Sequence, residues 1–155
     1  MTTADSGLDT EEINDLKETV RRLQKDANAK AVLLIDKDGR QVAAAGEHEQ
    51  YDVTSLASVT AGSGSDDLAK LIRERELSVM PHEGQQDYFH ISIVATYAIL
   101  LVAFDARSSL GLVRLQVKRA GGDFDKILGA MAQRGSSDAS LTEITDDDIE
   151  RLFSA

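Results

Sequence analysis

The sequence contains no cysteine, one proline, and far fewer basic than acidic residues. Without cysteine, neither a disulfide bond nor a metal site with thiolate ligands can form. The 17 basic and 27 acidic residues give a formal net charge of −10. This charge disfavours nucleic acids and anionic membranes as partners, because both bind basic surfaces. The first twelve residues lack the basic start and apolar core of a signal peptide, so we expect a cytoplasmic protein without membrane insertion.

Motifs for catalysis and for metal or cofactor binding are missing or incomplete. Residues 82–86 begin like a zinc-protease motif, but Gln86 stands where the second histidine is needed. Residues 36–39 resemble the start of a calcium loop without its closing Glu, and they fit a hairpin turn better. Gly62 and Gly64 lack the rest of a dinucleotide or phosphate motif. No nucleophile–base pair has a recognisable spacing. We therefore predict no metal, no cofactor and no active site of the chain's own.

The longest apolar stretch covers residues 88–105 and is rich in strand-forming residues. Its first half alternates, with His90 and Ser92 on the polar side, which predicts a strand with one face in water. Residues 98–104 are apolar at every position, which predicts a strand covered on both faces. A turn near residues 95–96 would make the stretch a central antiparallel hairpin.

The spacing of apolar residues predicts most of the other elements. Apolar residues three and four positions apart indicate helices over residues 9–28 and 110–131. A strand over residues 113–118 is the alternative to part of the second helix, and the length of the pattern favours the helix. Short apolar runs bounded by turn residues predict further strands over residues 31–35, 42–45 and 77–80.

A further helix is predicted from residue 52 to residue 75, and small residues dominate its first half. Gly62 and Gly64 each make a helix about 1 kcal/mol less stable than Ala would. Close approach of another backbone would offset this loss. From the residues alone, the segment is either a packing helix or a dimer interface.

The end of the chain has the pattern of a short acidic helix. Residues 138–155 contain six acidic residues and one basic residue, which is half of the net charge. Thr145 is a candidate N-cap, and Ile144 and Ile149 occupy the two positions of a hydrophobic staple. A helix this short is marginal alone, so we expect it to fold on docking, as an intramolecular cover or as a partner-binding peptide. Three apolar side chains share its inner face: Ile149, Leu152 and Phe153.

Six stretches spread over the chain carry a family resemblance: KDANAK (25–30), DVTSLAS (52–58), LAKLI (68–72), HEG (82–84), FDxRSSLGLVRL (104–115) and EITDDDI (143–149). Together they resemble the Roadblock/LC7 domain family, and within it the MglB-type regulators of the Ras-like GTPase MglA. The resemblance implies an α+β fold, an α/β/α sandwich. A five-stranded antiparallel sheet would carry the small-residue helix on one face and the two other long helices on the opposite face.

The resemblance also implies a domain organisation and a function. A Roadblock/LC7 domain would occupy residues 9–133, after a disordered segment of residues 1–8. Residues 134–155 would form a flexible linker and the amphipathic tail helix. A homodimer would bind one MglA-like small Ras-like GTPase and stimulate GTP hydrolysis without inserting an arginine, unlike regulators that supply one in trans. The tail would act in nucleotide exchange. Assembly beyond the dimer and enrichment at a cell pole stay open.

The resemblance assigns GTPase contact to two parts of the chain. On the tail they are Ile149, Leu152 and Phe153. On the small-residue helix they are Leu56, Ser58, Ala61, Gly62, Ser65, Asp67 and Leu68.

The sequence departs from the family pattern in this helix, because it is two residues shorter between Leu56 and Leu68. Such a deletion rotates the following residues by about 200°. We therefore expect the helix to break near Gly64 and restart at Ser65. For this reason a dimeric scaffold that recruits partners without altering GTP hydrolysis stays an alternative.

Overall fold

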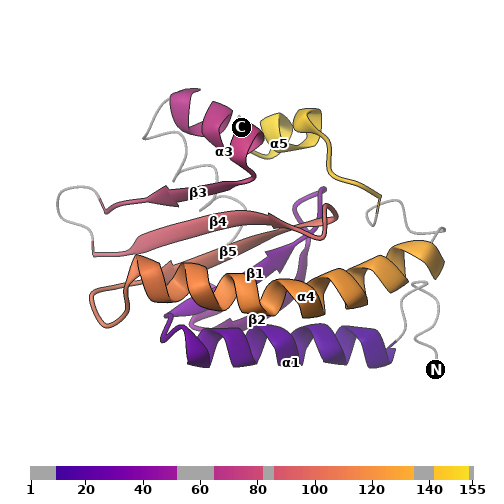
Figure 1. Ribbon diagram of the computed structural model, residues 1–155, viewed down its shortest axis with the longest axis horizontal. Helices are drawn as coiled ribbons and strands as arrows, with labels where there is room; N and C mark the ends of the chain where they lie inside the picture. Colours follow the sequence, from indigo (N-terminus) through magenta and orange to yellow (C-terminus); the bar gives the residue numbers. More distant parts are fainter. Residues whose placement is uncertain (1–9, 52–64, 82–85, 135–141, 154–155) are drawn as a thin grey trace.

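The computed structural model describes residues 10–51, 65–81, 86–134 and 142–153. In chain order the elements are α1 (Thr10–Asp26), β1 (Ala31–Ile35), β2 (Gln41–Gly46), the 3-10 helix η2 (His48–Gln50), α3 (Ser65–Glu74), β3 (Glu76–Val79), β4 (Tyr88–Val94), β5 (Ala98–Phe104), α4 (Leu110–Arg134) and α5 (Asp146–Phe153). The strands form one antiparallel sheet in the order β2-β1-β5-β4-β3. Helices cover both of its faces (Figure 1). The predicted α+β sandwich is confirmed.

The centre of the sheet is formed by β1 and β5. They pair over their whole length, from Ala31 opposite Ala103 to Ile35 opposite Ile99. Every residue of both strands is buried. The continuous apolar sequence of β5 therefore reflects a strand covered on both faces, as predicted.

The predicted central hairpin consists of β4 and β5. Ala95 (φ 54°) and Thr96 (φ 59°) both adopt the left-handed conformation, although neither is glycine. Two successive residues of this kind give a turn whose twist matches that of the paired strands. The Tyr97 N–H donates to the Val94 carbonyl oxygen at 3.1 Å and closes the turn.

The prediction that one face of β4 is in water is wrong. His90 is 1% exposed and Ser92 is 7% exposed. Their side chains lie on the face that α1 and α4 cover, and the Arg114 side chain of α4 reaches Glu76 of β3 across it at 3.1 Å. The alternation of polar and apolar residues in β4 thus marks buried polar side chains instead of a solvated face. His90 Nδ1 lies 3.1 Å from Ser78 Oγ, and Ser92 Oγ has no hydrogen-bond partner among the described residues.

The face covered by α1 and α4 holds the larger core. The two helices contact each other as well as the sheet (Figure 1). The helix interpretation of residues 110–131 is confirmed, because α4 runs without interruption through Gly121 and Gly122. Ser109 caps it by accepting the Leu112 N–H at 3.2 Å. The largest side chains buried here include Leu16, Leu34, Leu100 and Phe124.

The opposite face is covered by α3 and α5, which lie next to each other at the top of Figure 1. Its core contains apolar residues of the odd-numbered positions of β1 and β5, together with side chains of both helices. In the described residues no helix is long and apolar enough to cross a membrane. The sheet is thus sandwiched between two helical layers, and the described helices of the second layer are shorter than α1 and α4.

Candidate partner-binding site

The predicted contact residues of the small-residue helix are only partly covered by the structure. Leu56, Ser58, Ala61 and Gly62 lie outside the described residues. Ser65, Asp67 and Leu68 belong to the first turn of α3. Leu68 is half-buried and packs against the core on this face.

The position of α3 is fixed by its apolar stripe and by its C-terminus. Leu71 is completely buried between the helix and the sheet. Arg75 follows the helix with a left-handed conformation (φ 64°), and its N–H donates to the Leu71 carbonyl oxygen at 2.8 Å. The Arg75 carbonyl oxygen accepts the Ile93 N–H of β4 at 3.0 Å. The helix therefore ends in a left-handed cap and leads directly into β3.

The tail helix α5 begins with a reciprocal capping arrangement. The Asp148 N–H donates to Thr145 Oγ1 at 3.3 Å, and the Thr145 N–H donates to Asp148 Oδ2 at 2.9 Å. The Thr145 N–H bond holds the pKa of Asp148 below its ordinary value. The predicted N-cap is confirmed. The role of Asp148 was missed, although Thr-x-x-Asp before an apolar run has the spacing of a capping box.

The tail is docked on the chain's own sheet. Ile144 is 1% exposed, and its N–H donates to the Thr96 carbonyl oxygen of the β4–β5 turn at 2.7 Å. Arg75 Nη1 lies 3.5 Å from Asp146 Oδ1, which links the end of α3 to the start of α5. Of the two interpretations that the sequence left open, the structure shows the intramolecular cover. The three tail residues assigned to partner contact lie in the core with Leu71: Ile149, Leu152 and Phe153.

The outer surface of the tail is acidic. Because the apolar side chains of α5 point inward, most of its charged residues remain in solvent, and the capping residue Asp148 is the buried exception. The exposed acidic residues around the helix are Glu143, Asp146, Asp147 and Glu150. A partner that approaches α5 from outside meets negative charge, so basic side chains would complement this surface. Among the described residues, no group of His, Asp and Glu side chains could hold a metal ion.

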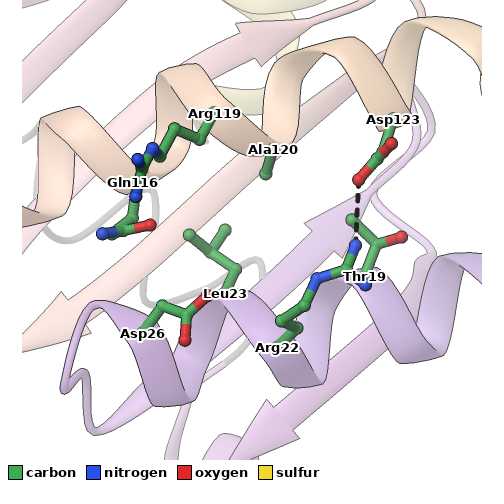
Figure 2. Close-up of a pocket in the computed structure, with 8 residues that line it drawn as sticks. All are labelled: Thr19, Arg22, Leu23, Asp26, Gln116, Arg119, Ala120 and Asp123. Carbon is green, nitrogen blue, oxygen red and sulfur yellow. Dashed lines mark hydrogen bonds and ion pairs between the residues drawn. The ribbon is translucent and has the colours of Figure 1, made fainter.

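A polar groove between α1 and α4 lies on the opposite face (Figure 2). Arg22 of α1 and Asp123 of α4 form an ion pair across it, with Nη2 and Oδ2 2.9 Å apart. Its volume of about 110 Å³ is well below the roughly 300–1,000 Å³ typical of ligand pockets. We interpret it as the seam between two packed helices.

A larger apolar groove lies beside the free edge of the sheet. It has a volume of about 520 Å³ and is lined by residues from β3, β4, the end of β5 and the segment that leads into α4. Among the described residues, β3 is an edge strand that pairs with β4 alone. Met80, just after β3, is 64% exposed. An edge strand with apolar side chains is a surface on which a further strand can pair.

The described residues thus form one antiparallel sheet between two helical layers, with β3 at one edge. The Roadblock/LC7 domain matches residues 15–104, and the chain belongs to this family.

Within the family, the chain is similar to MglB of Myxococcus xanthus. The two are 42% identical, with a TM-score of 0.61, over 80% of this chain and 95% of that chain. The gliding protein MglB of Thermus thermophilus has the same fold, with 23% identity and a TM-score of 0.58 over 77% of this chain and 93% of that one. An MglB described with a tetrameric arrangement shares the fold at 22% identity and a TM-score of 0.59, over 80% and 95% of the two chains. A comparison with curated proteins found no match.

Proposed function

We propose that this chain is a homodimeric regulator of an MglA-like small Ras-like GTPase, acting in the cytoplasm in bacterial cell polarity and motility. The observation that carries the proposal is the 42% identity to Myxococcus xanthus MglB over 95% of that protein. The chain would stimulate GTP hydrolysis by the GTPase and would have no active site of its own.

The GTPase would bind on the face of α3. Ser65, Asp67 and Leu68 are the described part of the predicted contact, and α3 is held in a fixed relation to β3 by the cap at Arg75. A rigid contact element lowers the entropy lost on binding. Replacing Ala61 with Arg would place a large charged side chain in the predicted contact. We expect it to abolish GTPase binding while the protein stays folded.

The homodimer would form through β3. The strand leaves one row of backbone groups without a partner in the sheet, and the apolar groove of about 520 Å³ lies beside it. Pairing of two β3 strands would satisfy these backbone groups and cover Met80.

Stimulation of hydrolysis would not depend on an arginine from this chain. Arg107 is engaged by Asp105, with its Nε 3.1 Å and its Nη2 3.0 Å from the carboxylate oxygens. Arg114 is engaged by Glu76 at 3.1 Å. An arginine finger needs a guanidinium that can reach into another protein's active site, and both of these side chains already have partners on their own chain.

The decisive experiment is single-turnover GTP hydrolysis by the cognate GTPase with and without this protein. Arg107→Ala, Arg114→Ala and Arg119→Ala variants are measured beside the wild type. We expect acceleration that survives all three substitutions. Loss of acceleration with one of them, while binding is retained, would identify a trans arginine and overturn the proposed mode of action.

The tail would act in nucleotide exchange and not in hydrolysis. Truncation after Ser140 removes α5 and should leave hydrolysis stimulation largely intact while it weakens exchange stimulation. Because the inner face of α5 is buried in this structure, partner contact through that face requires the helix to leave the sheet. Loss of hydrolysis stimulation on truncation would show that the docked tail supports α3.

The second candidate function is a dimeric scaffold that recruits partners without altering hydrolysis. The two-residue shortening between Leu56 and Leu68 favours it, because the deletion changes the face that the predicted contact helix presents. A scaffold would bind the GDP and GTP forms of the GTPase equally, and it would leave single-turnover hydrolysis unchanged.

A further inference from the structure

Three side chains from distant parts of the chain meet at Asp87. Lys30 Nζ donates to Asp87 Oδ1 at 2.8 Å, and the Tyr51 hydroxyl donates to Asp87 Oδ2 at 2.8 Å. The side chains of Lys30 and Asp87 are 18% and 25% exposed, and Tyr51 is 7% exposed. Both oxygens of the carboxylate thus have a donor in a site that is largely shielded from water, where such bonds are strong.

The pKa shifts of Lys30 and Tyr51 fit this arrangement. The hydrogen bond to Asp87 raises the pKa of Lys30. Burial, and then the hydrogen bond to Asp87, raises the pKa of Tyr51 to about 12. Near neutral pH Lys30 therefore carries an ammonium group and Tyr51 a neutral hydroxyl, and both donate to Asp87.

The backbone of Lys30 is tied to β5 and to the residue after β2 by hydrogen bonds. Its N–H donates to the Ala103 carbonyl oxygen at 2.8 Å, and its own carbonyl oxygen accepts the Glu47 N–H at 2.8 Å. Gly46, with φ +77°, packs directly on this carbonyl group, where a Cβ atom would lie 2.3 Å from the oxygen. Only glycine fits there. The backbone from which the Lys30 side chain extends is therefore fixed in place.

Tyr51 and Asp87 flank residues 52–86, the segment that contains α3 and the edge strand β3. Tyr51 follows η2 directly, and Asp87 directly precedes β4. The predicted GTPase contacts outside the tail all belong to this segment, including the first turn of α3. The Tyr51 ring also packs edge-on against Phe89 of β4, with ring centroids 5.8 Å apart. One carboxylate thus joins the two ends of the segment that carries the predicted contact.

We infer that Asp87, with Lys30 and Tyr51, is a positioning residue for GTPase binding. It joins the residues on either side of the segment 52–86, and this link adds to the apolar stripe and the C-terminal cap that position α3. This inference rests on the proposed function for its partner, but the anchoring itself can be measured on the protein alone. Removing one charge-assisted hydrogen bond of the cluster should weaken GTPase binding by about tenfold, with little change in the fold.

The test uses single substitutions at each member of the cluster, of which Asp87→Asn affects both bonds and the other substitutions one bond each. Asp87→Asn removes the carboxylate charge, and Lys30→Met removes its cation. Tyr51→Phe removes only the hydroxyl and keeps the ring contact with Phe89. Lys30→Arg keeps a cationic donor and should retain the wild-type hydrogen exchange and the wild-type affinity for the GTPase. Asp123→Asn is the matched control, because it breaks an ion pair of similar length on the opposite face (Figure 2).

Two quantities are measured for each variant. The first is hydrogen exchange of the amides in residues 52–64 in the protein alone. The second is the Kd for the cognate GTPase loaded with a non-hydrolysable GTP analogue. We expect Asp87→Asn, Lys30→Met and Tyr51→Phe to speed the exchange and weaken binding, and Lys30→Arg and Asp123→Asn to change neither.

The outcomes separate this inference from the proposed function. If the wild type does not bind the GTPase, the proposed function and the positioning role both fail, and the exchange data show only whether an anchor exists. If the wild type binds and the variants bind equally well, the positioning role is overturned and the proposed function stands. Should Asp87→Asn fail to fold in a thermal melt, Tyr51→Phe carries the same comparison with a milder change.

Discussion

The two faces of the sheet are built in different ways. One is covered by α1 and α4, which have 17 and 25 residues and contact each other along their length. The other is covered by α3 and α5, which have 10 and 8 residues. Helices as short as these are marginal in isolation, so their stability comes from capping and docking. We therefore expect α5, the shortest of the four, to separate from the sheet more easily than α1 or α4.

Both faces carry polar contacts between elements. On the α1/α4 face Arg22 pairs with Asp123 and Arg114 of α4 pairs with Glu76 of β3, and these pairs are partly exposed, so they add little stability. On the α3/α5 face two polar contacts hold the tail. The pair of Arg75 and Asp146 joins two helices, and Ile144 joins the tail to the β4–β5 turn. Breaking a junction should release an element without unfolding the domain.

The largest effect is expected for Phe124→Ala on the α1/α4 face. Phe124 is completely buried in α4, and truncation of a buried Phe typically costs about 3–5 kcal/mol. The free energy of unfolding, measured by denaturant titration, should fall by this amount. Amide protection should be lost together in β1, β5 and both long helices.

Phe153→Ala is the matched substitution on the other face, where Phe153 is 5% exposed. The loss in global stability should be smaller than for Phe124→Ala, because it cannot exceed the docking free energy of the tail. Hydrogen exchange of residues 142–153 should speed up while β1 and β5 keep their protection. Equal loss of protection in β1 after both substitutions would show that α5 is part of the folding core, and the contrast between the faces would disappear.

The sequence predicted the first face better than the second for a physical reason. Periodicity over many residues identifies α1 and α4, and the continuous apolar run identifies β5 as a central strand. The same method failed for His90 and Ser92, because buried polar side chains and a wet strand face give the same alternation. The bond between Lys30 and Asp87 spans 57 positions, and no local pattern contains it. The packing of α5 depends on tertiary contacts in the same way, although its capping residues were recognisable.

His90, on the α1/α4 face, should make the free energy of unfolding depend on pH, at pH values higher than those at which carboxylates titrate. Burial lowers the pKa of His90, against the opposing effect of Glu76 and with a smaller contribution in the same direction from Arg114. Its neutral ring lies 3.1 Å from Ser78 Oγ. The unfolded state therefore binds a proton at His90 more readily than the folded state does. The contribution of His90 to stability is constant above pH 6.5, and it falls as the pH drops from there to the lowered folded-state pKa.

The free energy of unfolding can change by up to about 1.4 kcal/mol per pH unit when one proton is bound. Denaturant titrations between about pH 7.5 and about pH 5, which bracket the ordinary pKa of histidine, would measure it. The His90→Asn variant should lose this slope, and His48→Asn, which changes a histidine outside the core, should keep it. If both variants retain the wild-type slope, another group is responsible.

The smallest effect is expected for Thr145→Ala at the start of α5, and it tests the junction itself. Loss of the Thr145 hydroxyl removes the acceptor of the Asp148 N–H, and loss of an N-cap costs about 1 kcal/mol. Exchange of the α5 amides should speed up about fivefold, and the exposed Glu150→Ala control should change it little.

The lowered pKa of Asp148 also predicts that docking of the tail depends on pH. Its contribution to tail docking is present above the ordinary pKa of 3.8 and is lost as the pH falls through the folded-state value. Acidification should therefore weaken the α1/α4 face first, through His90, and release the tail only at lower pH. Tail release near neutral pH would show that a group other than Asp148 controls the docking of α5.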